Sequence, residues 1–305
     1  MNTKNRVSQL ALVAVASCAA LPAFSQTLGI DTNYAFIDLS SGSTLGLNQA
    51  EINGPSLVGN GVTANASGGN GGGYGTIYYD SSVVNSSTFS KLQPLPTLTS
   101  VSTSTTSTAL SDAVSFANYA KGLSANQTFG ALTSAQTISA TVTGLNVIDL
   151  TSIKNAPLTL NGTASDFFII NVSDYINSNV AMTLTGGLTG HNILFNFTGT
   201  GAGNGGAVFQ TSGGDTQYGT YLLAATGSGG KMQFSNLDIV QGALIDAVAS
   251  SNVQFVSGSK IQQFTPVPLP AAAWLLLSGV GGLGLFARRR RASAAQPSDL
   301  GHATA

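Results

Sequence analysis

Residues able to do acid–base or metal chemistry are few in this chain. His191 is the only histidine before the final residues, and a catalytic or metal-binding histidine normally has partners. Asp149, Asp166 and Asp174 lie close together in sequence, which makes them candidates for a carboxylate pair in a polysaccharide-active enzyme. Such a site would normally also carry a basic side chain, often Arg or Lys, and residues 26–270 contain no arginine. We therefore predict that His191 is a turn residue before a strand and that the aspartates cap turns.

One glycine motif superficially fits a nucleotide site. Residues 201–206, GAGNGG, match G-x-G-x-x-G, but such a loop binds a dinucleotide only where it opens a helix. The segment that follows, Ala207 to Gln210, reads as a strand, so we predict a turn. Gly230-Lys231 lacks the other residues of a phosphate-binding loop.

A calcium site is also disfavoured by the residue types. The glycine-rich segment 68–75 resembles a calcium-binding repeat, but it contains no aspartate, and Asp215 and Asp238 are isolated. Calcium needs several oxygen ligands together. We predict no metal, no cofactor and no catalytic residue, and we expect the chain not to be an enzyme.

Threonines recur in strand-like segments. Regular threonine ladders on a flat β-face would support ice binding. However, no strict T-x-T repeat returns at a constant period, so we expect exposed threonines on a β-face. The threonines concerned are Thr141, Thr143, Thr159, Thr183 and Thr185.

The elements that position these residues are mostly short strands. From residue 126 onward, β-branched and aromatic runs recur at about 10–20 residues, separated by Gly, Asn and Ser turns. A hairpin sandwich and a parallel solenoid both fit, and we favour the solenoid because the turns are rich in Gly and Asn. One helix is predicted over 109–122 from apolar spacing, with Ser111 or Asp112 near its start, and 97–108 as an extended connection. The predicted fold class is all-β, a right-handed β-solenoid-like body with one helix.

Composition limits the partners of this body. Residues 26–264 form one predicted domain, and residues 26–270 hold five lysines against eleven carboxylates, a net charge of −6. A mildly acidic, arginine-free surface is a poor binder of nucleic acid. The only cysteine is Cys18, so the body must be stable without disulfides.

The N-terminus predicts export. Residues 1–25 read as a signal peptide: a basic start, an apolar stretch, and a cleavage site between Ser25 and Gln26. Val15 to Cys18 also fits a lipobox, which leaves lipidation of Cys18 as an alternative.

The C-terminus predicts a membrane anchor. Residues 269–287 are uncharged and long enough to span a bilayer as a helix. The arginines that follow place 292–305 in the cytoplasm by the positive-inside rule. The Pro motif, span and basic cluster, residues 265–291, resemble the PEP-CTERM sorting signal, although Leu269 stands where Glu is usual. The motif residues are Val267, Pro268, Leu269, Pro270, Arg288, Arg289, Arg290 and Arg291.

That resemblance implies a route and a partner. Its members are processed by an exosortase in Gram-negative bacteria that make exopolysaccharide. We therefore expect an exported precursor held in the inner membrane, then released to the cell surface or extracellular matrix, with exosortase as its processing partner.

A second resemblance covers most of 109–260. The strand-like segments 166–172 and 191–197, followed by 219–224 and 239–245, are similar to the choice-of-anchor A family of surface proteins. It implies a right-handed β-solenoid with a non-enzymatic adhesion or biofilm role, for which the expected partner is exopolysaccharide or another surface glycan. The helix-plus-solenoid layout is also similar to ice-binding β-solenoids, so an ice- or glycan-binding module is the alternative function.

Overall fold

The computed structural model describes residues 33–263, with gaps at 40, 49, 60, 67–72, 83, 225–229 and 257. All described elements belong to one compact unit, Met1–Phe264. The predicted signal peptide, the sorting motif and the span 269–287 lie outside the described residues. Within them, no helix combines the length and apolar character that crossing a bilayer requires.

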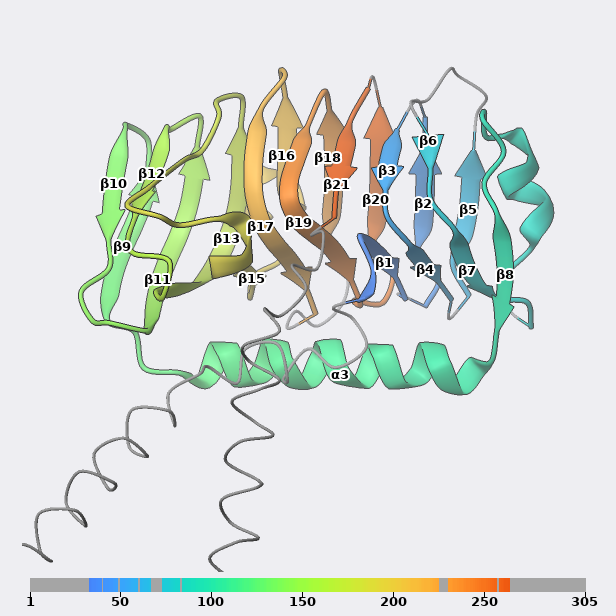
Figure 1. Ribbon diagram of the computed structural model, residues 1–305, viewed down its shortest axis with the longest axis horizontal. Coiled ribbons are helices and arrows are strands. Elements are labelled where there is room, and N and C mark those ends of the chain that lie inside the picture. The colour runs from blue at the N-terminus through green and yellow to red at the C-terminus, as the bar shows by residue number, and fades with distance from the viewer. Residues whose placement is uncertain are drawn as a thin grey trace, which may run out of the picture. The chain divides into compact units, whose positions relative to one another are not determined.

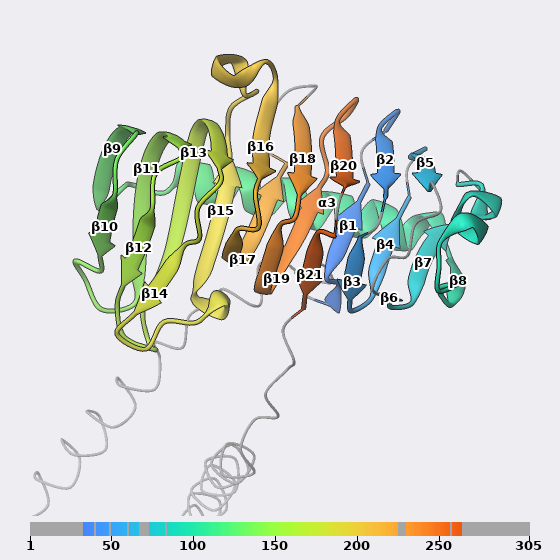
Figure 2. The same ribbon diagram turned by 90° about the horizontal axis from the view of Figure 1, so that it is seen from above.

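The body is a β-solenoid whose turns visit three faces (Figures 1 and 2). Every strand pairing between described residues is parallel, which confirms the solenoid over the hairpin sandwich. The helix-covered face contains, in stacking order, β8 (Leu98–Val101), β7 (Ile77–Asp80), β4 (Ser56–Val58), β1 (Phe36–Asp38), the end of β19 (Asp238–Asp246), the end of β17 (Thr216–Leu223), β15 (Ile193–Phe197), and the first parts of β13 (Phe167–Ser178), β11 (Leu145–Lys154) and β9 (Gln127–Leu132).

The other two faces are made from the remaining strands. The second face, named the amide face after its exposed side chains, runs through β5 (Thr63–Ala66), β2 (Thr44–Leu47), β20 (Asn252–Val256), β18 (Lys231–Ser235), β16 (Ala207–Ser212) and the ends of β13 and β11. The third face contains β6 (Gly73–Tyr74), β3 (Glu51–Asn53), β21 (Lys260–Gln262), the starts of β19 and β17, and a separate sheet of β14 (Thr183–Thr185), β12 (Leu158–Asn161) and β10 (Gln136–Ser139).

The chain path is discontinuous along the stack. The described chain starts in the middle, because β1 pairs with β4 on one side and with β19 on the other. After β8, the helix α3 (Thr103–Gly122) runs back along the stack to the opposite end, where β9 begins the remaining rungs (Figure 1). Twenty helical residues span about 30 Å. The N-terminal rungs therefore stack on the last rungs of the same solenoid.

Aromatic side chains fill the interior as a column. Tyr221 stacks on Phe195 and Phe209, with ring centroids 4.8 and 4.5 Å apart, and Phe209 continues to Phe234 and Phe255. All of these side chains are buried. Burial of these rings, together with the aliphatic side chains packed around them, stabilises the rungs.

A second apolar cluster joins α3 to its sheet. The helix buries Ala109, Ala113 and Ala117, whose small side chains permit close approach to the strands. The outward residues of the sheet that meet it include Ile37, Leu57, Ile169, Leu194, Leu222 and Ile245. Two amides add polar anchors at the end of α3. Asn196 donates to the carbonyl oxygen of Ala117 at 3.0 Å, and Asn171 donates to that of Ala120 at 3.1 Å.

One corner depends on stacked glycines. Gly219 lies beside Gly242 where the third face turns into the helix-covered face. Gly219 has φ of +99°, a backbone region that favours glycine. A Cβ on Gly242 would lie 2.0 Å from the carbonyl oxygen of Gly219, so only glycine fits there.

The predicted helix start was wrong. The helix begins at Thr103, with Ser102 as its N-cap, and not near Ser111 or Asp112. Residues 103–108 are serines and threonines of modest helix propensity, but Thr106 is buried and its hydroxyl bonds Asp80. Tertiary packing therefore extends the helix through a segment predicted as an extended connection. The strands β2, β3, β5, β6, β9 and β21 were not predicted, and β6 lies in the segment 68–75 that was expected to be a loop.

Candidate functional site

The separate sheet β10–β12–β14 carries a regular array of small polar side chains. Each of its strands contains three consecutive residues of the same pattern. The first and third side chains point outward, and the apolar side chain between them points inward. Register places Thr137 beside Thr159 and Thr159 beside Thr183 in a first row. Ser139, Asn161 and Thr185 form the second row in the same way. We call these six residues the hydroxyl array.

The array is exposed and held firmly from below. Its side chains are exposed except for that of Thr159, which is half-buried. Ile138 and Leu160 point inward and are buried in the core. Threonine is stiff at χ1, so strands fixed by their inner residues also fix the hydroxyl positions.

Hydrogen bonds fix the second row further. The Thr185 hydroxyl donates to Oδ1 of Asn161 at 2.9 Å, and the amide of Asn161 donates to the Ser139 hydroxyl at 3.3 Å. The row is therefore a chain of bonds that crosses all three strands. In Figure 2 the strands lie side by side.

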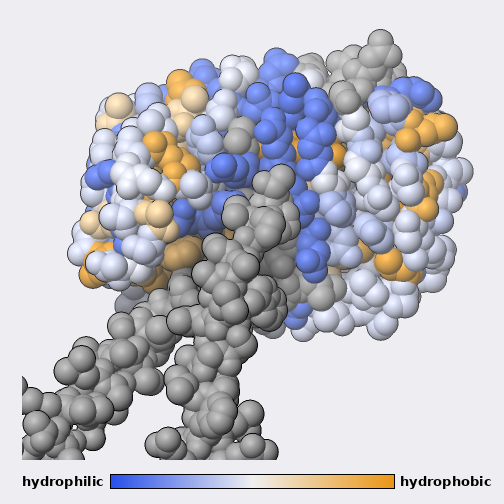
Figure 3. All heavy atoms as spheres, in the orientation of Figure 1, coloured by the Kyte–Doolittle hydropathy of each residue, from blue (hydrophilic) through white to orange (hydrophobic). Residues whose placement is uncertain are grey.

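The geometry of the array suits contact with an ordered surface. Neighbouring rungs lie about 4.8 Å apart and alternate residues of a strand about 6.6 Å apart. None of β10, β12 and β14 contains a charged residue. Figure 3 shows a mostly pale surface over the β10–β12 end, with the most hydrophilic residues over the middle of the body. A two-dimensional lattice of uncharged donors and acceptors can order a layer of water.

The threonine prediction was correct only in part. Thr159, Thr183 and Thr185 are on one β-face, as expected. Thr141 and Thr143 are not, because the chain turns after Ser139, and the Asn146 side chain accepts a bond from the Thr141 backbone N–H at 2.8 Å. Sequence reasoning missed Thr137, Ser139 and Asn161, whose only signal was their place one residue either side of a buried apolar residue.

The aspartate candidates do not form one site. Asp166 is buried at a turn, where the N–H groups of Gly144 and Thr163 donate to its carboxylate at 2.9 and 2.8 Å. These bonds hold the pKa of Asp166 below its usual value. Asp174 accepts from the N–H of Gly203. Both aspartates cap turns, as predicted.

Asp149 departs from that prediction. It lies on β11 opposite Asn171 and accepts a bond from the Asn171 amide at 3.2 Å. Because it belongs to the polar contacts beside the end of α3, it serves the sheet and not a turn. Asp149 therefore has a different structural role from Asp166 and Asp174, which cap turns.

The histidine and glycine predictions are confirmed. His191 lies in the 3-10 turn Gly190–Asn192 directly before β15, and partial burial lowers its pKa. Gly201 and Gly205 have left-handed backbone angles at either end of a short turn, which leads into strand β16 and not into a long helix. No group of three potential metal ligands occurs among the described residues.

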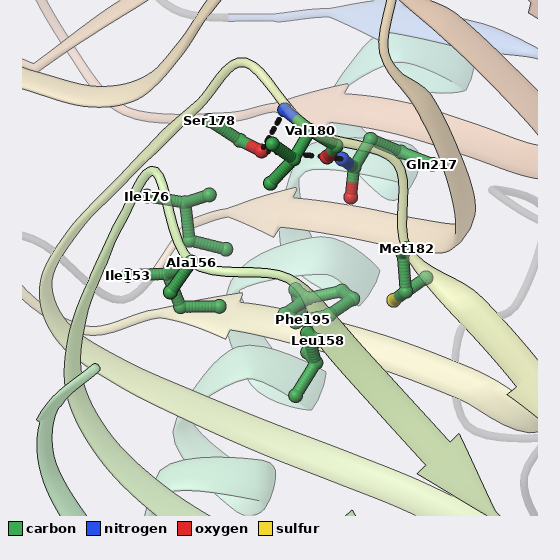
Figure 4. A pocket seen from close by; sticks show the side chains of 9 residues that line it. All are labelled: Ile153, Ala156, Leu158, Ile176, Ser178, Val180, Met182, Phe195 and Gln217. Carbon is green, nitrogen blue, oxygen red and sulfur yellow. Dashed lines mark hydrogen bonds between the residues drawn. The ribbon is translucent and has the colours of Figure 1, made fainter. Parts of the chain in front are cut away.

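A narrow internal space in the described part of the body is lined by apolar side chains, with Ser178 and Gln217 at its edge (Figure 4). Its volume of about 10 Å³ is room for no more than one water. Ser178 and Gln217 both donate to the carbonyl oxygen of Val180. The space is a packing gap and not a ligand pocket.

The sorting residues Val267 to Pro270 and Arg288 to Arg291, and the cleavage pair Ser25 and Gln26, lie outside the described residues.

No family model and no curated protein matches the chain. Solved structures do match its fold. An ice-binding protein from the Antarctic ascomycete Antarctomyces psychrotrophicus is 14% identical, with a TM-score of 0.50 over 78% of this chain and 98% of that one. An ice-binding protein from an Antarctic Flavobacteriaceae bacterium is 16% identical, with a TM-score of 0.51 over 79% of this chain and 48% of that one. The chain is thus similar in fold to these ice-binding proteins. It spans almost the full length of the ascomycete protein and about half the length of the bacterial one.

Proposed function

We propose that this chain is a non-enzymatic exported protein that binds ice through the hydroxyl array. The observation that carries the proposal is the register of Thr137, Thr159 and Thr183 beside Ser139, Asn161 and Thr185. All six side chains are uncharged, and all but the half-buried Thr159 are exposed. Their strands are anchored by the buried Ile138 and Leu160 and by the partly buried Leu184. The fold that the chain shares with ice-binding proteins supports the same function.

Rigidity is the physical basis of the proposal. Each contact between a hydroxyl and a solid water surface is weak, because the same hydroxyl already bonds liquid water. Many such contacts add up only when the side chains lose little freedom on binding. Threonines on anchored strands meet that condition, since their rotamers are restricted before binding. The methyl groups add apolar area between the hydroxyls.

The test uses the body, residues 26–264, which contains the whole described core. Ice crystals grown in its presence should become faceted, and freezing should be depressed below melting. The variant Thr159→Lys with Thr183→Lys places two long charged chains in the first row and should abolish both effects. Thr63→Lys on the amide face is the matched control and should leave them unchanged. Wild-type body that does not shape ice would refute the proposal.

The two termini support a proposal for where in the cell the protein acts. The signal peptide predicts export, and the PEP-CTERM-like tail predicts retention in the inner membrane and cleavage by an exosortase near 266–270. We propose that the body is then presented at the cell surface or in the matrix, where it would hold cells to ice. The intact mass of the protein outside the inner membrane tests this route. The released protein should begin at Gln26 and end between Pro266 and Pro270, and a form that keeps the tail or carries lipid on Cys18 would contradict the route.

A further inference from the structure

The amide face carries a row of side chains quite different from the hydroxyl array. On successive strands, register aligns Asn65, Gly46, Gln254, Gln233, Gln210, Asn177 and Lys154. All of these positions point outward, because the residues next to them, such as Leu45, Val253 and Phe209, are buried. At about 4.8 Å per rung the row is about 29 Å long. It is a track of carboxamides, which both donate and accept hydrogen bonds.

Part of the track is held in place by its own contacts. The amide of Asn177 donates to Oδ1 of Asn204 at 3.2 Å, and the amide of Asn204 donates to Oε1 of Gln210 at 3.1 Å. Asn204 comes from the turn before β16. These bonds fix the direction of the amides at that end and leave their remaining donors and acceptors for a ligand.

The track has one gap, at Gly46. Without a side chain there, a hollow of about 390 Å³ opens between its neighbours. The hollow is lined by polar side chains only: Thr44, Asn48, Asn65, Lys91, Asn252 and Gln254 surround Gly46. Its volume is in the range of small-molecule sites, but its lining of hydroxyl, amide and ammonium groups suits a hydroxyl-rich ligand.

The charge on this face is opposite to that of the whole body. Lys91, Lys154 and Lys231 are exposed on or beside it, and they are three of the five lysines in residues 26–270. One carboxylate, that of Asp174, lies beside the Asn177 end of the face, where it accepts from the N–H of Gly203. The strand segments that form the face itself contain no Asp or Glu. The other faces carry carboxylates, such as Glu51 and Asp238. A cationic face on a protein of net negative charge attracts anions selectively.

We propose that the amide face binds an acidic polysaccharide, a polymer of uronate sugars, laid along the track with one sugar in the hollow at Gly46. Uronates combine hydroxyls, which amides recognise, with a carboxylate, which Lys91 and Lys231 attract. A protein partner is disfavoured because the described residues that line the hollow are all polar or glycine, with no aromatic anchor of the kind that dominates protein interfaces among them. This site is separate from the hydroxyl array, so the proposal does not depend on whether the chain binds ice.

The test measures binding of polygalacturonate to the body, residues 26–264, by titration at low salt. Wild-type protein should bind, and binding should weaken as salt screens the lysines. The variant Lys91→Gln with Lys231→Gln should bind about tenfold more weakly. Lys121→Gln with Lys260→Gln is the matched control: it removes the same charge from other faces and should leave the affinity within about twofold of wild type.

A second variant separates the hollow from the charge. Gly46→Gln extends the amide row into the hollow without changing the net charge. A Cβ there would meet nothing closer than 3.4 Å, so the substitution fits the folded rung. It should also weaken binding about tenfold, while the melting temperature stays near wild type. Absence of polygalacturonate binding, equal loss in the control, or equal affinity for neutral dextran or for polyphosphate would each overturn the proposal.

Discussion

Asn196 is predicted to hold α3 on the solenoid. Its side chain is fully buried between the sheet and the helix, and its amide nitrogen donates to the carbonyl oxygen of Ala117 at 3.0 Å and to Oδ1 of Asn171 at 2.9 Å. The substitution Asn196→Ala removes the donor for both acceptors in a region that water does not reach. It leaves the apolar contacts of the helix alanines in place.

The expected loss follows from those two bonds. A buried acceptor left without its donor costs about 1–3 kcal/mol. The substitution also removes Oδ1 of Asn196, which has no hydrogen-bond partner within the described part of the chain, and that removal offsets part of the cost. We expect a net loss of about 2–4 kcal/mol. For a domain of this size each kcal/mol lowers the melting temperature by roughly 2–4 °C, so the decrease should be roughly 5–15 °C.

Thermal unfolding followed by circular dichroism measures this loss. Asn53→Ala is the matched control, because the Asn53 side chain is exposed on β3 and donates to the neighbouring side chain of Glu51. Exposed substitutions of this kind change stability by about 0.5 kcal/mol or less. Backbone amides of α3 should exchange faster in Asn196→Ala. A melting temperature equal to that of the control, with unchanged exchange in the helix, would refute the anchoring role.

Three further predictions concern buried groups. Burial raises the pKa of Asp215, so its contribution to stability is present at low pH and lost as pH rises through the folded pKa; Asp215→Asn should therefore raise the melting temperature at pH 7 more than at pH 4. The bonds from Gly144 and Thr163 lower the pKa of Asp166, so its contribution is present above about pH 4 and lost on acidification; in urea titrations, Asp166→Ala should flatten the acid limb of stability against pH. Gly242→Ala should cost about 2–4 kcal/mol by chemical denaturation, because its Cβ would meet a backbone carbonyl.

Local sequence patterns predicted the strands well where the side-chain types alone favour a β-strand. The run Phe167 to Val172 and the run Ile193 to Phe197 are rich in β-branched and aromatic residues, and both are strands. Their Gly- and Asn-rich turns indicated a solenoid, which the parallel pairing confirms. The start of the helix was missed, because the packing of Thr106 outweighs the low propensity of its Ser and Thr neighbours.

The sequence did not allow us to predict which residues of distant strands lie side by side. The second row of the hydroxyl array joins residues 22 and 24 positions apart, so no constant period reveals it. The same holds for the amide track, where Gly46 lies beside Gln254 because the N-terminal rungs stack on the last ones. Which faces align depends on the full path of the chain, and each unequal loop shifts the spacing.

Competitive partition into ice tests the central claim most directly. The wild-type body, Thr63→Lys and Thr159→Lys with Thr183→Lys are mixed in equal amounts, and a single ice front is grown slowly through the solution. The protein recovered from the ice is then quantified by intact mass. The hydroxyl array predicts enrichment of wild type and Thr63→Lys to the same degree, with the double variant left in the liquid. Equal partition of all three proteins, or exclusion of wild type from the ice, would contradict the account.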